Sequence, residues 1–145
     1  MPLSTDTDVA RVLSRTRRIA VVGASAKPQR PSHQVMQYLQ AEGFELYPVN
    51  PGLAGQTLLG CPVYARLADI PVAIDMVDVF RRASYLPQVV EEAIEVGAGL
   101  VWTQLDVVDH RAAAAAERAG LEVVMDRCPA IEMPRLKAAG LITPA

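Results

Sequence analysis

One stretch near the N-terminus has the residue types and spacing of an anion-binding loop. The apolar run Ile19–Val22 is typical of a buried strand, and Gly23, Ala24 and Ser25 follow it directly. Ser32 is placed to cap the helix that comes next. A helix start has unpaired backbone N–H groups and a partial positive charge, which together attract phosphate. We therefore expect the glycine loop, defined as residues 23–30, to bind a ligand that carries a nucleotide.

Basic side chains accompany this loop and one other corner of the chain. Lys27 and Arg30 lie within the glycine loop, where they could supply charge to a phosphate or could be ordinary solvated surface charges. Arg81 follows the run Ala73–Phe80 and precedes Ser84, which is predicted to cap another helix. Arg81 therefore marks a second corner suited to phosphate.

The glycine loop lacks most of the dinucleotide-binding fingerprint. That fingerprint is G-x-G-x-x-G, and positions 23–28 keep only its first glycine. An NAD site also needs an acidic residue after the second strand to bind the ribose hydroxyls, and Asn50 stands there instead. Both departures count against NAD(P), although an oxidoreductase-type domain stays open as an alternative. A second alternative is an interaction module without ligand, in which Gly23 makes only a tight turn.

The residue types that most often perform catalysis are not assembled by the sequence. His33 and His110 each fall in the first turn of a predicted helix with no nucleophile or carboxylate beside them, so surface or capping roles are expected. Cys61 and Cys128 have neither metal-ligand nor disulfide spacing. Cys128 is expected to be a small buried residue. We predict no catalytic residue and no metal site.

Length and composition limit the class of protein. The 145 residues suit a single domain, and 51% hydrophobic with 5% aromatic residues favours an aliphatic α/β domain. A net charge of −2 and a pI near 5.6 give no electrostatic basis for nucleic-acid binding. No apolar run reaches the roughly 20 residues of a membrane span, and the first residues lack the parts of a signal peptide. A cytoplasmic location with no membrane partner is expected.

Predicted helices and strands alternate along the chain. A leading helix is expected at about 6–15, and the core of the domain at about 17–136. The strands are expected at 19–22, 46–50, 73–80, 100–104 and 121–125, and the main helices at 32–42, 84–96 and 109–119. This alternation predicts a doubly wound, mainly parallel five-stranded sheet with helices on both faces, in one domain covering 1–145.

Two carboxylates within the third predicted strand need partners. Buried strands rarely tolerate unpaired carboxylates, so we expect Asp75 and Asp78 to lie at a strand end or to accept hydrogen bonds from backbone donors. This role is favoured over a catalytic one. A small extended or hairpin segment is predicted at 58–64, and a turn or short helix near 67–70.

The carboxyl ends of the predicted strands define where a ligand would bind. In an open parallel sheet, ligands lie beyond these ends, where the winding reverses. The segments concerned are residues 23–25, 50–52, 79–81, 102–104 and 126–129. Together they could line one elongated groove.

Five short motifs fall in register along the chain, four of them at these strand ends. They are Val-Val-Gly-Ala-Ser (21–25), Pro-Val-Asn-Pro (48–51), Leu-Gly-Cys-Pro-Val-Tyr (59–64), Val-Trp-Thr-Gln (101–104) and Asp-Arg-Cys-Pro-Ala-Ile-Glu (126–132). In this order and spacing they resemble the stand-alone CoA-binding domain family. More distantly, they resemble the N-terminal CoA-binding domain of the succinyl-CoA synthetase alpha subunit. The resemblance covers about 17–136 and implies a Rossmann-like domain that binds coenzyme A (CoA).

The resemblance also implies roles for individual residues. Residues 23–25 would contact the CoA phosphates, Asn50 and Pro51 would lie beside the nucleotide, and Cys128 would lie near the thiol end. These roles suit the chemistry of CoA, because its diphosphate needs loop N–H groups and a helix start.

Further positions would contact the remaining parts of the ligand. By resemblance, Val79, Phe80 and Arg81 would flank the adenine or its phosphates, and Thr103 and Gln104 would reach the pantetheine arm. An arginine suits the extra phosphate of CoA, and amide side chains in an apolar slot suit the pantetheine amides.

Departures from the synthetase limit what can be carried over. Leu53 stands where the synthetase has a lysine, and Gln104 where it has a glutamate. Its second domain, which carries the phosphohistidine, has no counterpart in this sequence, so its reaction is not carried over. We predict a protein that binds CoA or acyl-CoA in a non-catalytic carrier, sensing or regulatory role. A subunit of a CoA-dependent enzyme that acts with a partner chain stays open as an alternative.

Overall fold

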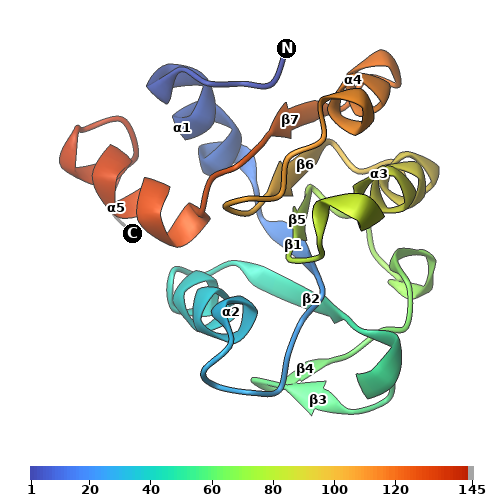
Figure 1. Ribbon diagram of the computed structural model, residues 1–145. Coiled ribbons are helices and arrows are strands. Elements are labelled where there is room, and N and C mark those ends of the chain that lie inside the picture. The colour runs from blue at the N-terminus through green and yellow to red at the C-terminus, as the bar shows by residue number, and fades with distance from the viewer. Residues whose placement is uncertain (144–145) are drawn as a thin grey trace.

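A five-stranded parallel sheet forms the centre of the computed structural model, which describes residues 1–143 (Figure 1). Its order is β2-β1-β5-β6-β7. The strands are β1 Arg18–Val22, β2 Glu45–Val49, β5 Met76–Val79, β6 Leu100–Thr103 and β7 Glu122–Val124. Every neighbouring pair in this sheet is parallel, which confirms the predicted parallel architecture.

Helices cover both faces of the sheet, as Figure 1 shows. One face packs against α1 (Asp6–Arg15), α2 (Pro31–Ala41) and α5 (Pro129–Ala138). The opposite face packs against α3 (Leu86–Glu95) and α4 (His110–Arg118). The predicted doubly wound fold is therefore confirmed, including the leading helix. Within the described residues, no helix combines the length and apolar character needed to cross a membrane.

The winding of the chain reverses between β1 and β5. The chain passes from β1 to β2 at the sheet edge and then returns to place β5 on the other side of β1. The returning segment contains the 3-10 helix η1 (Pro51–Leu53), the antiparallel pair β3 (Thr57–Leu58) and β4 (Cys61–Pro62), and the 3-10 helix η2 (Leu67–Asp69). This confirms the predicted hairpin and short helix. It also places a reversal point, where such folds bind ligands, at the ends of β1 and β5.

Two helix starts differ from the sequence-based prediction. Helix α2 begins at Pro31, so Ser32 lies inside its first turn and is not the cap. Residues Ala83–Tyr85 form the 3-10 helix η3, so Ser84 does not cap α3 either. Proline explains both differences, because its fixed φ and missing N–H suit the first turn of a helix. Neither α2 nor α3 has a side-chain cap.

The third core strand, β5, is shorter than expected because the side chain of Asp75, and not a strand backbone, bonds to the start of β1. Oδ2 of Asp75 accepts hydrogen bonds from the backbone N–H groups of Arg17 (3.0 Å) and Arg18 (2.9 Å). Asp75 therefore lies just before β5 and provides the acceptor for the backbone N–H groups at the start of β1. This confirms its predicted structural role. The strand proper begins at Met76 and not at Ala73.

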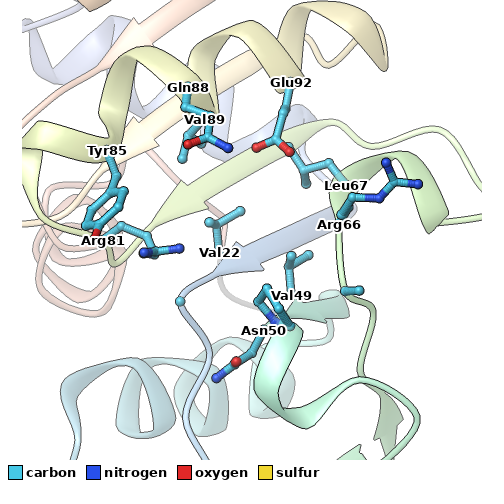
Figure 2. A pocket seen from close by; sticks show the side chains of 13 residues that line it. Val22, Val49, Asn50, Arg66, Leu67, Arg81, Tyr85, Gln88, Val89 and Glu92 are labelled. Atoms are coloured by element: carbon cyan, nitrogen blue, oxygen red, sulfur yellow. The ribbon is translucent and has the colours of Figure 1, made fainter.

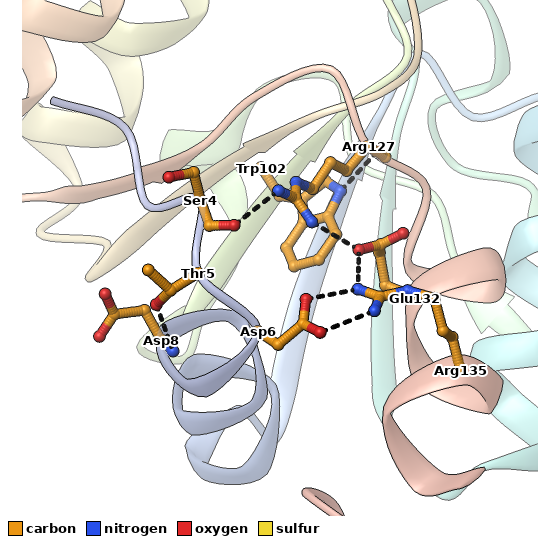
Figure 3. Close-up of polar contacts among 8 residues, drawn as sticks. All are labelled: Ser4, Thr5, Asp6, Asp8, Trp102, Arg127, Glu132 and Arg135. Atoms are coloured by element: carbon orange, nitrogen blue, oxygen red, sulfur yellow. Dashed lines mark hydrogen bonds and ion pairs between the residues drawn. The ribbon is translucent and has the colours of Figure 1, made fainter. Parts of the chain in front are cut away.

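A cluster of ion pairs joins the N-terminal segment to α5 (Figure 3). The carboxylate of Glu132, 9% exposed, accepts from Arg127 at 2.7 Å and from Arg135 at 2.9 Å. Arg135 also makes two bonds to Asp6, and Arg127 donates to the carbonyl oxygen of Ser4 at 2.8 Å. Glu132 is thus the buried centre of a cluster that holds α5 over the α1 side of the sheet.

Replacing this buried centre should destabilise the domain more than replacing its exposed edge. Glu132→Ala leaves two guanidinium groups without their shared partner, so we expect a loss of about 2 kcal/mol in the free energy of unfolding. Asp6→Asn changes an exposed pair and should cost clearly less. Urea unfolding followed by Trp102 fluorescence measures both. Equal losses in the two variants would show that the burial of Glu132 contributes nothing.

Candidate functional site

The glycine loop leaves the sheet where β1 meets the ends of β2 and β5. Gly23 has φ +90°, and its N–H donates to the carbonyl oxygen of Val49 at 3.1 Å. A Cβ at this position would lie 3.2 Å from the carbonyl carbon and oxygen of Phe80. Only glycine combines that left-handed backbone with so close an approach. The first glycine of the fingerprint is therefore required by the fold itself.

Within the described residues, four backbone N–H groups in the glycine loop and the first turn of α2 have no hydrogen-bond partner: those of Ser25, Ala26, Gln29 and Ser32. The N–H groups of Gly23 and Ala24 both donate to the carbonyl oxygen of Val49 on β2. Helix α2 has no side-chain cap that would compete for its first turn. The donors available to an anion therefore begin at Ser25 and extend along the chain to Ser32.

Two side chains hold the loop in place. Nδ2 of Asn50 donates to the carbonyl oxygen of Ala24 at 2.8 Å, and its Oδ1 accepts from the N–H of Gly52 at 2.9 Å. Nδ1 of His33 lies 2.9 Å from the carbonyl oxygen of Ser25. Since a carbonyl can only accept, Nδ1 must carry the proton. His33 is 7% exposed, so the expectation of a surface role is wrong.

Three cavities lie side by side along the carboxyl edge of the sheet. The loop cavity, about 400 Å³, is lined by the glycine loop together with Asn50 and Phe80. It shares Gly23 and Asn50 with the arginine cavity of about 460 Å³. On its other side it shares Pro31 and Phe80 with the cysteine cavity of about 540 Å³. The shared lining residues place the three cavities next to one another, and together they are called the groove below.

Most of the predicted site residues line this groove. The predicted residues that line the loop cavity are Gly23, Ala24, Ser25, Lys27, Arg30, Asn50 and Phe80. Pro51 and Arg81 line the arginine cavity, and Gln104 and Cys128 line the cysteine cavity. Val79 and Thr103 line none of the three and have no exposed surface. The Thr103 hydroxyl donates to the carbonyl oxygen of Val107 and accepts from the N–H of Asp126, so the fold already uses it.

The arginine cavity contains side chains that sequence reasoning missed (Figure 2). Arg66 lies just before η2, Tyr85 ends η3, and Gln88 and Glu92 come from α3. The guanidinium of Arg81 stacks 4.0 Å from the centre of the Tyr85 ring. Burial, followed by the charge of Glu95, raises the pKa of Glu92. Gln88 and Glu92 are four residues apart and therefore share one face of α3, which was the available sequence signal.

The cysteine cavity combines apolar walls with a few polar groups. Cys128, 9% exposed, lies at the start of α5, and burial raises the pKa of its thiol. That thiol is therefore protonated near neutral pH and is not an activated nucleophile. Gln104 lines the same cavity and donates from Nε2 to Oδ1 of Asp78 at 2.8 Å.

Asp78 is the most unusual buried group in the described part of the chain. It has no exposed surface, and its Oδ2 has no hydrogen-bond partner among residues 1–143. Loss of hydration raises its pKa from 3.8 to about 7, opposed in part by the hydrogen bond from Gln104. The expectation that Asp78 lies at a strand end or accepts from backbone donors is wrong, since its recorded partner is a side-chain amide.

Fold and groove together define the class: a single-domain, Rossmann-like α/β protein whose open groove lies at the winding reversal. Within that class the family is shown directly. The chain belongs to the CoA-binding domain family, whose model matches residues 17–134. The predicted resemblance to the stand-alone members of this family is therefore confirmed.

Known relatives include small proteins of similar length. An uncharacterized protein of Bacillus subtilis, YneT, is 40% identical over 121 residues, which cover 83% of this chain and 88% of YneT. The structure of a hypothetical protein from Pyrococcus horikoshii superposes with a TM-score of 0.88 at 40% identity, covering 94% of this chain and 96% of that one.

A larger enzyme subunit is also related. The alpha subunit of an ADP-forming acetate–CoA ligase from Pyrococcus furiosus is 34% identical over 93 residues, which cover 61% of this chain and 20% of the subunit. The region is homologous, but the chain spans only a fifth of that subunit. The more distant relation to succinyl-CoA synthetase stays a prediction.

Removing the Asp78 carboxylate should change how stability depends on pH. A folded-state pKa raised from 3.8 to about 7 means that stability is lost as pH rises between these values. At 1.36 kcal/mol per pKa unit, the loss reaches up to about 4 kcal/mol above neutral pH. Asp78→Asn lacks this ionisation. Urea unfolding from pH 5 to pH 8 measures the free energy of unfolding of Asp78→Asn minus that of the wild type. This difference should increase with pH and level off above pH 7. A difference independent of pH would contradict the raised pKa.

Proposed function

We propose that the groove binds CoA and that the protein acts as a non-catalytic CoA carrier, sensor or regulator. The observation that carries this proposal is that the three cavities lie next to one another along the carboxyl edge of the sheet. Their sequence of chemistries, from arginines through a loop with free N–H groups to an apolar cavity with an amide, parallels the order of groups along CoA.

Each cavity matches one part of the ligand. The arginine cavity would receive the adenosine end and its 3′-phosphate through Arg81 and Arg66. The loop cavity would receive the diphosphate through Lys27, Arg30 and the free backbone donors. The cysteine cavity would receive the pantetheine arm or an acyl-CoA, with the thiol end near Cys128.

The geometry favours CoA over NAD(P). Asn50 stands where an NAD site has its ribose-binding acid, and its Oδ1 and Nδ2 both already bond to the backbone of the protein. It retains one free N–H and one free lone pair, but it lacks the charge with which a carboxylate binds both ribose hydroxyls. The residues present therefore support an NAD site less well than a CoA site.

A role within a larger assembly is the second candidate. The homologous region of the ligase alpha subunit makes up a fifth of that subunit. A partner chain could supply reaction chemistry to CoA held in this groove. Co-purification of a partner together with ligase activity would favour this candidate. The cytoplasmic location stays a prediction.

Calorimetric titration with CoA, dephospho-CoA and NAD tests the proposal. We expect saturable CoA binding near micromolar Kd, or about −8 kcal/mol, weaker binding of dephospho-CoA, and none of NAD. NAD binding without CoA binding would instead support the oxidoreductase alternative. No binding of any of the three would support an interaction module without ligand.

Removing charge from the glycine loop should weaken CoA binding. Lys27→Ala and Arg30→Ala each take away one cation that lines the loop cavity, and we expect Kd to rise about fivefold to tenfold. Arg118→Ala is the matched control, because Arg118 is exposed at the far end of α4. Calorimetry measures all three variants. A similar rise in Kd for Arg118→Ala would show that the effect comes from the overall charge of the protein and not from the loop cavity.

Arg81 should discriminate the 3′-phosphate of CoA. We expect Arg81→Ala to weaken CoA binding about tenfold, while dephospho-CoA, which lacks that phosphate, loses far less. The double cycle of protein variant and ligand variant isolates this one contact and separates it from the stacking of Arg81 on Tyr85. Equal losses of affinity for CoA and dephospho-CoA would show that Arg81 does not contact the 3′-phosphate.

A further inference from the structure

The pair of Asp78 and Gln104 occupies the junction between the core and the cysteine cavity. Asp78 is a fully buried residue of the central strand β5, paired in register with Val21 of β1 and Trp102 of β6. Gln104 follows β6 directly and lines the cavity, 8% exposed. The hydrogen bond between them therefore links a group without solvent contact to the wall of a ligand cavity.

This hydrogen bond fixes which end of the Gln104 amide faces the cavity. An ionised carboxylate can only accept, so it holds the Nε2 donor of Gln104 at 2.8 Å from Oδ1 of Asp78. Oε1 of Gln104, which accepts no hydrogen bond from the described residues, is then left to the cavity side. The cavity wall consequently offers an acceptor and not a donor.

Protonation of Asp78 removes that restriction. A neutral carboxyl group has an O–H donor, and the amide of Gln104 can then turn to accept from it and present Nε2 to the cavity. The raised pKa of Asp78, about 7, brings this change close to neutral pH. The proton then belongs on Oδ1, from which it can be donated to Oε1 of Gln104, because Oδ2 has no partner that could accept it.

Other titratable groups near the pair act differently. Val21 and Trp102, the neighbours on β1 and β6, do not titrate. From α5, the Cys128 thiol is influenced by the charges of Asp78 and Glu132, and Glu132 is paired with two arginines. From α2, the buried titratable side chain is His33, which bonds to the glycine loop. His33 thus acts on the phosphate end of the groove and not on the cysteine cavity.

We propose that Asp78 is a specificity-determining positioning residue: it orients the Gln104 amide so that Oε1 accepts a hydrogen bond from an N–H of the ligand arm in the cysteine cavity. This inference rests on the proposed function, since CoA supplies such N–H groups in its two pantetheine amides. Asp78 would thus determine selectivity for an arm that bears amides without contacting the ligand itself.

The test compares two ligands that share one end. The comparison ligand must share the 3′-phosphate and the esterified 5′-diphosphate of CoA and lack only the pantetheine arm. The comparison ligand is therefore the β-methyl ester of adenosine 3′-phosphate 5′-diphosphate. Ionisation of the 3′-phosphate near pH 6 affects this ester and CoA alike, so the ratio of their Kd values isolates the arm. Calorimetry at pH 5.5, 6.5, 7.2 and 8 measures this ratio in the wild type, Asp78→Asn and Gln104→Met.

In the wild type, the preference for CoA over the methyl ester should fall about fivefold to tenfold from pH 8 to pH 5.5, as one oriented hydrogen bond is lost. Asp78→Asn should show a preference that does not change with pH, because an asparagine side chain does not titrate. Gln104→Met, which has no amide to orient, should also be independent of pH and should match the low-pH wild type. Circular dichroism checks that each variant is folded.

The outcomes separate the two proposals. A wild-type preference independent of pH, or a pH dependence that survives in either variant, overturns the inference while CoA binding stands. If Asp78→Asn does not fold, Gln104→Met gives the same decision on its own. Absence of CoA binding at every pH overturns the proposed function and the inference with it.

Discussion

The close approach of β1 and β5 at the winding reversal is the constraint on which the site depends. The Cβ that Gly23 lacks would lie 3.2 Å from backbone atoms of Phe80, and the N–H of Phe80 donates to the carbonyl oxygen of Val22 at 2.8 Å. This contact lets the glycine loop and the β5–η3 segment leave the sheet side by side. As a result, Phe80 borders both the loop cavity and the cysteine cavity, and Arg81 reaches the arginine cavity.

The same constraint explains why one fingerprint glycine is kept while others are replaced. Gly23 needs a left-handed backbone and a close approach to Phe80, whereas Ser25 and Pro28, at the other two glycine positions, do not have a left-handed backbone. The loop is held instead by Asn50 and His33 through the carbonyl oxygens of Ala24 and Ser25. A loop held through its carbonyls keeps N–H groups available, which is what an anion requires.

Much of this arrangement could be predicted from sequence because it depends on local patterns. Apolar periodicity predicted the order of helices and strands, and the strand ends then predicted the edge where the cavities lie. The Ser32 and Ser84 caps were wrong because Pro31 and Pro87 set the helix starts. Val79 and Thr103 lie outside the groove because each is the last residue of its strand and is still enclosed by the sheet. The contribution of Arg66 depends on tertiary packing that no local pattern contains, and the helical spacing of Gln88 and Glu92 does not by itself show which cavity their face lines.

The polar groups of the groove divide into those the fold uses and those it leaves free. Asn50, His33 and Thr103 bond within the protein, and the Cys128 thiol has a raised pKa. The free groups include backbone N–H donors, flexible cations, the acceptor of Gln104, and the Gln88 and Glu92 side chains of the arginine cavity. Covalent catalysis would need an activated nucleophile with an adjacent base, whereas the burial of the Cys128 thiol raises its pKa. This division between used and free groups is the chemical basis of the binding function that we propose.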